Sequence, residues 1–551
     1  KGKKKKFKPK EKLFTTWGNF LTALDELYRR ILGWSIQHRK TVVFLTLGLF
    51  IMSIAVIPLV GMEFLPQQDS GEYTVNISLP NGTAVRETQR VTKIVEQYIE
   101  EMPEHEWAIY AVGLEAGMIS SGSTPEKAII RGKLTEKRER TRSLNQVLDD
   151  LRNKCASIPG AKIEINALDV AMGGLQSPIE IGLTGDNLEV LEMLAQTIAT
   201  RVKEVEGARE VKTSIEDARP EVHLKLQRKK AEQYGINTTQ LSSLLSTAIN
   251  GTTATRYREK GEEIDVRIVL DEQYRRNIND LESLMISSPY GSLVHLRDIA
   301  EIEFADGPTQ IERKNQARRV TITGDIYERD LKSVVDDIQS ALDDLTIPPG
   351  IQLEFGGAHQ EMVKAFGDLS LALILAIVLV YMILAAQFEG LLYPFVIMFS
   401  IPPTLIGVVF ALLFTGRTLS IPTFVGIIML AGIVVNNAIV LVDYINTLRR
   451  RDGLSREEAI LKAGPTRLRP ILMTALTTIL ALLPLTLGIG EGAELSAPMA
   501  TAVAGGLTVS TLITLVLIPC LYIIMDNFSA KLKRLWGRRK KAEVNSMVGG
   551  E

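Results

Sequence analysis

Two asparagines inside an apolar run are the residues best placed to do chemistry in this sequence. Asn436 and Asn437 lie in the run from Leu419 to Val442. If Phe424 and Tyr444 are interfacial aromatics, both asparagines lie within about 3 Å of the midplane of a membrane-spanning helix. Polar groups are costly in hydrocarbon, so both are expected to face protein, where they could join a proton relay. The alternative is that they only hold helices together, through hydrogen bonds typically worth about 0.6 kcal/mol.

A second candidate is the segment RLRPILMT, which runs from Arg467 to Thr474. Because Arg467 and Thr474 are seven positions apart, they point to nearly the same face of a helix, and Pro470 between them can kink it. This places an arginine and a hydroxyl on one side of a membrane helix, where they could serve the same relay. The alternative is that Arg467 and Arg469 are cytoplasmic anchors that follow the positive-inside rule.

Other classes of chemistry lack their residues in this sequence. It contains no GxxxxGK[ST] phosphate loop and no group of His, Glu and Cys with metal-ligand or nucleophilic spacing, and its 5 histidines are scattered. Cys155 and Cys520 are far apart, which argues against a disulfide framework and a thiolate metal site. A net charge of -1 gives no signal for nucleic acid. The sequence therefore predicts no enzyme, no cofactor, no metal and no nucleic-acid partner, and leaves an ion gradient as the energy source.

The composition indicates that part of the chain lies in a membrane and part in water, because 46% of the residues are hydrophobic and yet 23% are charged. A bilayer core needs roughly 20 apolar residues per helix, and six runs reach or approach that length, which predicts a polytopic membrane protein. The runs are Thr41 to Val60, Phe366 to Ala386, Leu391 to Phe414, Leu419 to Val442, Pro470 to Leu487 and Pro498 to Met525.

Lysine and arginine residues that flank the runs predict how the chain crosses the membrane. The basic start at Lys3 to Lys6, the loop from Arg449 to Arg456 and the tail from Lys531 to Lys541 fall on one side of six spans. The positive-inside rule makes that side cytoplasmic, so both ends are cytoplasmic and the long stretch between the first two spans is exported. The chain opens at Lys1 with neither a methionine nor a signal peptide, which is typical of a fragment.

An amphipathic segment precedes the first span. From Phe14 to Ile36, apolar residues recur at helical spacing, with Trp17, Leu24 and Tyr28 along one side. This pattern favours an interfacial helix that leads into the membrane. The alternative is a helix that merely covers a neighbouring helix.

The exported stretch repeats a unit of strand, helix and strand. Alternating apolar residues predict the strands, a period of 3.6 predicts the helices, and turn residues such as Pro349-Gly350 separate them. Two such units make a ferredoxin-like, split βαβ sandwich. An insert from Pro220 to Pro308 interrupts the second sandwich; strands dominate it, but Asn237 to Ala248 is helical, with Asn237 or Thr238 as its cap. The four units span 73–112, 127–166, 179–214 and 318–355.

Three segments resemble the resistance-nodulation-division (RND) family of efflux transporters, in the C-terminal half of such proteins. GIVVNNAIVLVDY, from Gly432 to Tyr444, is similar to the fourth helix of that half, and RLRPILMT is similar to the fifth. AAQFEGLLYPF, from Ala385 to Phe395, is similar to the turn between the second and third helices. The order of elements fits this resemblance over nearly the whole chain, and the type it fits is the hydrophobe/amphiphile exporter.

The resemblance implies a polytopic α-helical membrane protein with six transmembrane helices, extracytoplasmic α+β ferredoxin-like (split βαβ) porter subdomains and an inserted docking subdomain. The implied parts are a cytoplasmic basic segment with an interfacial helix (1–39), the first transmembrane helix (40–62), the first porter subdomain (63–166), the second porter subdomain in two parts (167–219 and 313–361), the docking subdomain (220–312), a five-helix transmembrane bundle (362–528) and a cytoplasmic basic tail (529–551).

In function, the resemblance implies a homotrimeric secondary transporter, driven by the proton motive force, in the inner membrane of a bacterium. It would export drugs and other amphipathic small molecules, with a periplasmic adaptor and an outer-membrane channel as further partners and membrane lipid around it. The chain would be the C-terminal half, and the missing N-terminal half would carry the relay aspartates. The alternatives are export of lipid or polypeptide on the same fold, or a membrane-anchored binding or assembly protein.

The motif match assigns relay residues within this half. It places Arg467 and Thr474 beside the aspartates of the missing half, near Asn436 and Asn437. Drug pumps of Gram-negative bacteria carry lysine where this sequence has Asn436. An asparagine cannot supply that positive charge, so the pairing with buried carboxylates would be arranged differently here.

A glycine-rich loop takes the place of the family's substrate-gating loop. It is GLEAGMISSGS, with Gly113, Gly117, Met118 and Gly122 as the candidate residues, and its glycines favour mobility. The alternative is an ordinary flexible turn. The loop lacks aromatics, and Met118 and Met172 are isolated in the sequence, which argues against a metal cargo.

The insert carries a segment that looks like the family's docking segment. It runs from Ile236 to Ile268 and implies contact with a neighbouring subunit. Its candidate docking residues are Thr252, Arg256 and Arg258.

Overall fold

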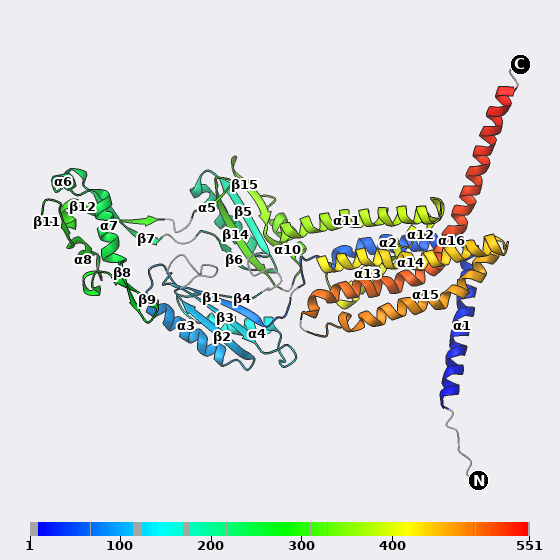
Figure 1. Cartoon of the computed structure of the whole chain (residues 1–551), viewed down its shortest axis with the longest axis horizontal. Helices are drawn as coiled ribbons and strands as arrows, with labels where there is room; N and C mark the ends of the chain where they lie inside the picture. The colour runs from blue at the N-terminus through cyan, green and yellow to red at the C-terminus, as the bar shows by residue number, and fades with distance from the viewer. Residues whose placement is uncertain are drawn as a thin grey trace, which may run out of the picture.

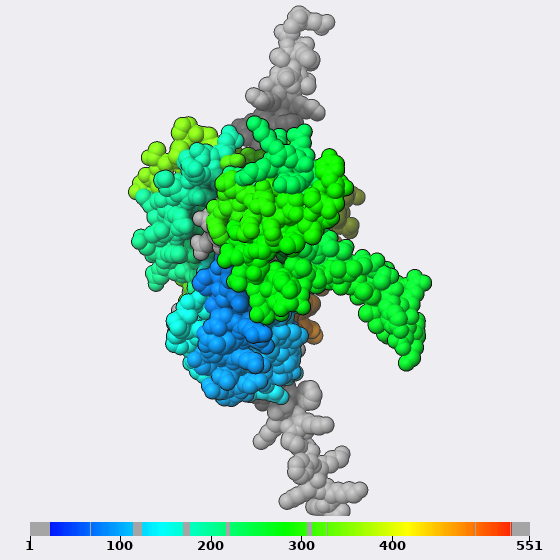
Figure 2. All heavy atoms as spheres, turned by 90° about the vertical axis from the view of Figure 1, so that its left-hand side faces the viewer, coloured from blue at the N-terminus to red at the C-terminus, as the bar shows by residue number. Residues whose placement is uncertain are grey.

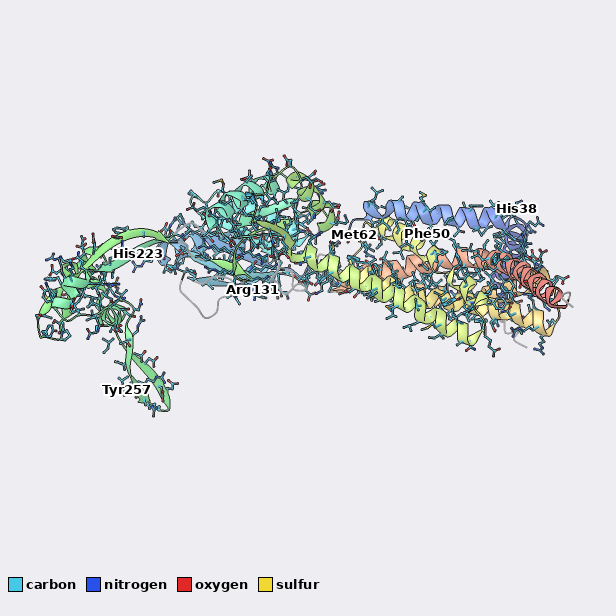
Figure 3. The ribbon with its side chains drawn as sticks, turned by 90° about the horizontal axis from the view of Figure 1, so that it is seen from above. His38, Phe50, Met62, Arg131, His223 and Tyr257 are labelled. Atoms are coloured by element: carbon cyan, nitrogen blue, oxygen red, sulfur yellow. The ribbon has the colours of Figure 1, made fainter. Side chains whose placement is uncertain are left out.

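The computed structural model describes residues 9–66, 68–113, 124–168, 177–215, 219–307, 311–327, 329–490 and 492–548. The molecule is elongated, with a bundle of long helices at one end, two α/β sandwiches in the middle and a smaller unit at the other end (Figure 1). Met62 lies where the bundle meets the sandwiches, and His38 lies at the opposite end of the bundle, its distal end (Figure 3).

Within the described residues, six helical segments are long and apolar enough to cross a membrane. This agrees with the six predicted spans. They are α2 (Arg39–Val60), α11 (Gly357–Gln387), α12 and α13 taken together (Leu392–Met398 and Pro402–Thr415), α14 (Ile421–Arg451), α15 (Arg456–Thr486) and α16 (Ala493–Val548).

Two of these helices differ from the prediction for local reasons. The third span is broken between α12 and α13, where Pro402 begins a new helix because a proline lacks the amide that a continuing helix requires. In contrast, α15 begins at Arg456 and not at Pro470, since Ser455 caps it in a reciprocal bond with Glu458. The first turns of α15 are polar, and hydropathy therefore misses them.

Helix α1 (Pro9–Gln37) crosses the distal end of the bundle at a steep angle to the spans (Figure 1). Its residues Tyr28, Leu32 and Ile36 are buried in the same apolar cluster as residues of α15 and α16. The Tyr28 hydroxyl donates a hydrogen bond to the carbonyl of Leu515 at 2.9 Å. One face of α1 thus covers neighbouring helices, which is one of the two predicted alternatives.

The first sandwich is a four-stranded antiparallel sheet with helices on one face. The sheet order is β2-β3-β1-β4, and along β1 the side chains of Tyr73, Val75 and Ile77 alternate into the core. Gly132 on β3 leaves the space that the Tyr73 ring fills. The elements are β1 (Glu72–Ser78), α3 (Val85–Glu100), β2 (His105–Val112), β3 (Lys127–Leu134), α4 (Leu144–Cys155) and β4 (Lys162–Ala167).

The second sandwich is assembled from two separate stretches of chain. Its central strand β14 pairs with β5, β6 and β13, so residues from both sides of the insert share one sheet. The core includes Ile181, Ile198 and Ile322. The elements are β5 (Ile179–Gly185), α5 (Leu188–Lys203), β6 (Ala208–Thr213), β13 (Glu312–Lys314), β14 (Ala317–Ile326), α10 (Leu331–Leu342) and β15 (Gln352–Gly356).

The insert forms the unit farthest from the bundle. Strands β7 (Arg219–Leu226) and β12 (Ala300–Gly307) pair antiparallel along their lengths and connect it to the second sandwich. Asn237 caps α7 in a reciprocal bond with Gln240, which confirms the predicted helix and selects the first of its two predicted caps. Short helices accompany the predicted strands. The other elements are α6 (Arg228–Gln233), α7 (Thr238–Ile249), α8 (Ile278–Glu282), β10 (Met285–Ser287), β11 (Leu293–His295) and α9 (Leu296–Ile299).

A long hairpin projects sideways from this unit (Figure 2). It consists of β8 (Thr252–Glu259) and β9 (Glu262–Ile268), and every residue of both strands is exposed. Tyr257 lies near its outer end (Figure 3).

Candidate functional site

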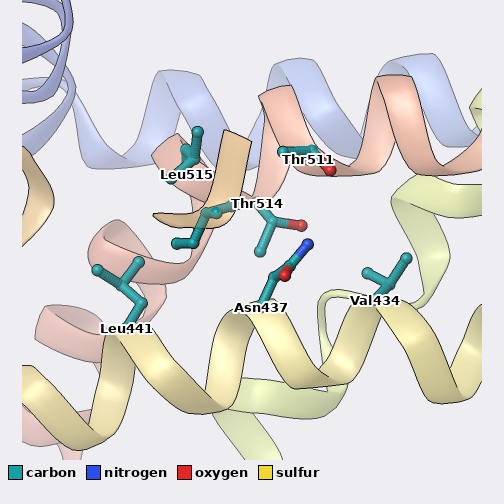
Figure 4. Close-up of a pocket in the computed structure, with 7 residues that line it drawn as sticks. Val434, Asn437, Leu441, Thr511, Thr514 and Leu515 are labelled. Carbon is teal, nitrogen blue, oxygen red and sulfur yellow. The ribbon is translucent and has the colours of Figure 1, made fainter. Parts of the chain in front are cut away.

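Asn437 is buried near the middle of α14, with 8% of its surface exposed. It lines a cavity of about 10 Å³ between α14, α15 and α16, which is close to the least space that one water molecule needs. The buried amide agrees with the prediction that this asparagine faces protein. The lining residues are Val434, Asn437, Leu441, Ile471, Thr511, Thr514 and Leu515 (Figure 4).

Two hydroxyls on α16 share this cavity with the amide. Thr511 and Thr514 are three positions apart and therefore lie on one face of the helix. Both side-chain oxygens are buried without a hydrogen-bond partner among the described residues. A buried hydroxyl without a partner is costly, so this cavity favours a polar occupant. The sequence analysis missed both residues, although two threonines at helical spacing in the last apolar run were a signal.

Asn436 lies on the other side of α14, where it is exposed. The described residues of this chain thus do not cover Asn436, and that it faces protein stays a prediction. The reason is geometric, since consecutive helix residues point about 100° apart. Asp443 and Thr447 are exposed on the same helix, and their spacing from Asn436 places all three on one face. A polar stripe thus runs along the outer surface of a membrane-length helix.

Arg467 packs against α14. Its guanidinium carbon lies 4.5 Å from the centre of the Tyr444 ring, a distance at which the ring face attracts the cation. Its Nε is buried and has no hydrogen-bond partner in the part of the chain that the structure describes. An arginine that served only as a cytoplasmic anchor would not need this contact with Tyr444. The guanidinium also has N–H groups left that could donate to a further group.

Thr474 is exposed on α15, and its hydroxyl donates to the carbonyl of Ile471 at 2.9 Å. It does not line the cavity of Asn437. Because α14 and α15 run in opposite directions, the seven residues from Arg467 to Thr474 and the seven from Tyr444 back to Asn437 cover the same length, about 10.5 Å. Thr474 therefore lies at about the depth of the asparagines, on the outside of the bundle.

A polar cluster closes the distal end of the bundle, and the sequence analysis missed it. The Tyr522 hydroxyl donates to Asn446 at 2.6 Å and accepts from Arg449 at 2.7 Å. Tyr393 stacks on the Tyr522 ring at 5.5 Å, and Arg449 pairs with Asp526 at 3.4 Å. The sequence analysis used Arg449 only for topology, whereas here it links α14 to α16.

The candidate gating loop lies mostly outside the described residues, which include Gly113 but not Gly117, Met118 or Gly122. Gly113 is buried and has a φ of 82°, a conformation that favours glycine. Its amide donates to Lys127 at 2.8 Å, and its carbonyl accepts from Thr124 at 3.1 Å. These two bonds close the base of the loop.

The candidate docking residues all lie on the projecting hairpin. Thr252, Arg256 and Arg258 are exposed on β8. Arg256 pairs with Asp265 at 3.0 Å, and Arg258 pairs with Glu263 at 2.7 Å. These pairs join the two strands, and apolar side chains of the hairpin such as Tyr257 and Ile264 remain exposed.

Among the described residues, no group of three or more His, Cys, Asp or Glu side chains is placed to hold a metal ion. Met118 and Met172, which the sequence analysis considered for a metal cargo, lie outside the described residues.

Comparison with known proteins identifies this arrangement. Residues 3–526 match the model of the AcrB/AcrD/AcrF family. The chain is 27% identical over 509 residues to the swarming motility protein SwrC of Bacillus subtilis, covering 92% of this chain and 48% of that protein. It is 28% identical over 512 residues to the cation efflux system protein CzcA of an Alcaligenes strain (90% and 48%). It is 27% identical over 532 residues to the multidrug resistance protein MdtC of Escherichia coli (96% and 51%).

A crystal structure of a heavy metal efflux pump superposes on 92% of this chain and 53% of its own, with a TM-score of 0.80 and 26% identity. The chain therefore spans about half the length of the relatives that it matches. The resemblance seen in the sequence is confirmed, and the chain belongs to the AcrB/AcrD/AcrF family of RND efflux transporters.

Proposed function

We propose that this chain is the C-terminal half of an RND efflux pump that exports amphipathic small molecules in exchange for protons. The observation that carries the proposal is the pair of polar surfaces on α14. One surface, at Asn437, encloses a small cavity with two hydroxyls that have no hydrogen-bond partner among the described residues. The other, at Asn436 and Asp443, is exposed on a helix of membrane length.

The exposed stripe is best explained as the contact surface for the other half of the pump. Polar side chains that face lipid are costly, most of all at the depth of Asn436, near the centre of the membrane. A second set of helices would remove that cost if it supplied polar partners. The relatives are about twice as long as this chain, which leaves room for such a half in the complete transporter.

In this proposal, Asn436, Arg467 and Thr474 face carboxylates that the other half supplies, and protons cross between the halves. Arg467 is half-buried, and its guanidinium has several N–H groups that could donate to a deprotonated carboxylate. Asn436 can donate an amide hydrogen bond but no charge, so Arg467 is the cation nearest to the relay. The cavity of Asn437, Thr511 and Thr514 lies beside it and has close to the least space that one water molecule needs.

The proposal extends to the parts outside the bundle. The two sandwiches would be porter subdomains in the periplasm, at 63–166 and at 167–219 with 313–361, and they would enclose the cargo under a gating loop at Gly113 to Gly122. The unit at 220–312 would dock onto neighbouring copies through Thr252, Arg256 and Arg258, which gives a homotrimer. Both chain ends would be cytoplasmic, and an adaptor and an outer-membrane channel would complete the export path.

The cargo is the part of this proposal on which the relatives differ. Their names point to cation efflux in one case and to multidrug resistance in another. The test therefore includes both classes of cargo.

Proton-coupled export is tested in inverted membrane vesicles that contain the complete transporter. We expect dye efflux that a protonophore abolishes, and Arg467→Ala should slow it at least about ten-fold, because the relay loses its cation. Arg450→Ala is the matched control, since Arg450 is an exposed arginine near the same end of the bundle. Its efflux should be unchanged, with equal amounts of trimer by cross-linking in all samples.

Each of the following three results would change the proposal. Equal efflux by Arg467→Ala and the unmutated protein would reduce Arg467 to a topological anchor. Protonophore-sensitive transport of zinc or cobalt without any dye efflux would replace the amphiphile cargo with a metal cargo. A transporter that moves neither would shift the assignment to lipid or polypeptide export, or to a membrane-anchored binding protein.

A further inference from the structure

Glu63 lies in the junction that joins the helix bundle to the second sandwich. It follows Met62, which lies where the bundle meets the sandwiches (Figure 3). The Glu63 amide donates to the carbonyl of Leu419 at 3.2 Å, and the Leu419 amide donates to the carbonyl of Gly61 at 3.0 Å. The segment after α2 is thus paired by backbone bonds with the segment before α14.

The Glu63 side chain contacts the same segment. It is half-buried, and its carboxylate accepts a hydrogen bond from the Thr418 hydroxyl. The other group that acts on its charge is the carboxylate of Asp330, the cap of α10. Among the described residues Glu63 forms no ion pair, so the chain itself does not neutralise its charge.

The surroundings of Glu63 are poor in solvent for a charged group. Its neighbours Met62 and Phe64 pack into an apolar cluster with Leu331 of α10 and Met362 of α11. Burial raises the pKa of Glu63 above its ordinary value of 4.5, the Thr418 hydroxyl offsets part of this rise, and the negative charge of Asp330 adds to it.

Asp330 is the less suitable of the two carboxyls to take up a proton. It accepts from the backbone amides of Met62 at 3.1 Å and Ser333 at 3.0 Å. Burial opposes the charged form, but the bonds from Ser333 and Met62 prevail and lower the pKa of Asp330 below its ordinary value. Asp330 lies against the end of α2, since a Cβ added at Gly61 would be 2.9 Å from its Cγ. A fixed negative charge therefore stands beside Glu63.

The other charged residues of the neighbouring elements are engaged elsewhere or exposed. They are Lys332, which pairs with Asp336, Arg329, which pairs with Asp337 at 2.7 Å, Arg417, which donates to the carbonyl of Thr486 at 2.6 Å, His359, whose charged neighbours are Asp336 and Lys332, and Glu361 and Lys364, which are exposed on α11. A proton is the species left to neutralise Glu63.

We propose that Glu63 binds a proton at the sandwich end of the bundle and that this proton tightens the junction between α2, α14 and the second sandwich. A proton from water converts the carboxylate to the neutral acid, which removes its repulsion with Asp330 and its cost of burial. The neutral acid still accepts from Thr418, so that contact is kept.

The sign of the effect follows from linkage. A carboxyl that binds its proton more tightly in the folded junction than in the open one stabilises the junction as the pH falls through the folded-state pKa. Helix α14, which carries Asn436 and Asn437, would then be held more firmly to α10 when the sandwich side is acidic. This consequence for transport rests on the proposed function, but proton binding by Glu63 does not.

Hydrogen exchange of the complete transporter in lipid nanodiscs tests the site without transport. Protection factors are corrected for the intrinsic effect of pH on exchange. From about pH 8 to about pH 5, protection of peptides covering 61–64, 418–421 and 330–336 should rise at least about three-fold. E63Q should hold the junction in its tight state at both pH values. The matched control is E312Q, since Glu312 on β13 is also half-buried and accepts from a threonine, Thr321, at 3.1 Å.

Two further variants keep Glu63 and move the pH of the transition in opposite directions. T418V should raise its midpoint, because the charged carboxylate loses a donor. D330N should lower it, because the neighbouring negative charge is gone, while asparagine still caps α10. The infrared band of a neutral carboxyl that appears on acidification should be missing in E63Q and present in E312Q.

The outcomes separate this site from the pump itself. A junction whose protection does not depend on pH, or depends on it equally in E63Q, would overturn the proposal. So would weaker protection in E63Q than in the unmutated protein at about pH 8, because the charged carboxylate would then hold the junction. The expected transition in a protein that transports nothing would keep the proton site and reject the proposed function.

Discussion

Asn436 and Asn437 of α14 are neighbours in the sequence, but they lie in different environments. Asn437 lies in a cavity with two threonines of α16, and Asn436 lies on the outer surface of the helix. The consequence is that only Asn436 is available to another set of helices. The buried amide belongs to this chain's own packing and can hold a single water molecule.

Outside the membrane helices, the buried carboxylate of Glu104 pairs with the partly exposed guanidinium of Arg142 in the first sandwich. Glu104 is 7% exposed and accepts two bonds from Arg142, at 2.7 and 2.8 Å. Those bonds lower the pKa of Glu104 below its ordinary value of 4.5. A carboxyl with a lowered pKa stabilises the fold above its unfolded-state pKa, and this contribution is lost as the pH falls through the folded-state pKa.

Glu104→Gln should therefore destabilise the first sandwich at pH 7 and have little effect below the folded-state pKa of Glu104. We expect a loss of about 1 kcal/mol at pH 7, below the usual range for charged bonds, because Arg142 is 36% exposed and water screens it. The measurement is the urea midpoint of the first sandwich at pH 7 and at a pH below the folded-state pKa of Glu104. It is followed by hydrogen exchange of peptides from β2 and α4. Glu106→Gln serves as control, since Glu106 is 45% exposed and its partner Lys133 is 3.8 Å away. An equal loss in both variants would contradict the assignment.

At the scale of elements, the bundle depends on a close crossing of α13 and α16. Gly407 on α13 faces Gly505 on α16 so closely that a Cβ added at either would overlap the other helix, and a Cβ added at Gly506 would overlap Leu430 of α14. Small residues allow this approach, and the backbones then gain dispersion contacts that lipid would otherwise supply. Thus α16 is the most buried of the six membrane-length helices.

Gly505→Ala should weaken this crossing, although alanine is the better helix former. Overpacking costs about 1–3 kcal/mol, which exceeds the gain of about 0.5–1 kcal/mol from replacing a helical glycine. The prediction is a lower thermal midpoint of the protein in detergent. Gly48→Ala on α2, where nothing lies within 4 Å of an added Cβ, should leave the midpoint unchanged or raise it. A rise in both variants would show that the crossing is loose.

For the whole molecule, the side chain of Asp330 joins the second sandwich to the bundle. Asp330 caps α10 of the second sandwich by accepting from Ser333 at 3.0 Å, and it also accepts from Met62 at the end of α2, at 3.1 Å. Backbone bonds then tie this end to the start of α14, where Leu419 donates to Gly61 at 3.0 Å. One side chain thus links a sandwich helix to two spans.

Asp330→Ala should loosen this junction as well as the helix it caps. Loss of an N-cap costs about 1 kcal/mol, so hydrogen exchange in α10 should rise about five-fold. We expect the same rise in peptides covering 61–64 and 418–421. The control is Asn187→Ala, which removes the cap of α5 but no contact with the bundle. If Asp330→Ala raised exchange in α10 alone, the side chain would be a cap and not a link.

Residue patterns along the chain were enough to predict the six spans, the repeated strand and helix units and a helix cap at Asn237 or Thr238. These features are local, because about 20 apolar residues, a repeat of 2 or 3.6 and a capping side chain each act within a short stretch of chain. The sequence also carried the motifs that identify the family, since those are contiguous.

Which polar residues meet could not be predicted from the sequence and follows from how the folded helices pack. Thr511 and Thr514 share a cavity with Asn437, although more than seventy positions separate them. Asp330 accepts a hydrogen bond from Met62, although the two residues lie far apart in the sequence. Hydropathy treats Asn436 and Asn437 alike, because it assigns a residue to the membrane but not to a side of a helix. Which side is covered depends on how helices from distant parts of the chain pack, and that is a property of the folded molecule.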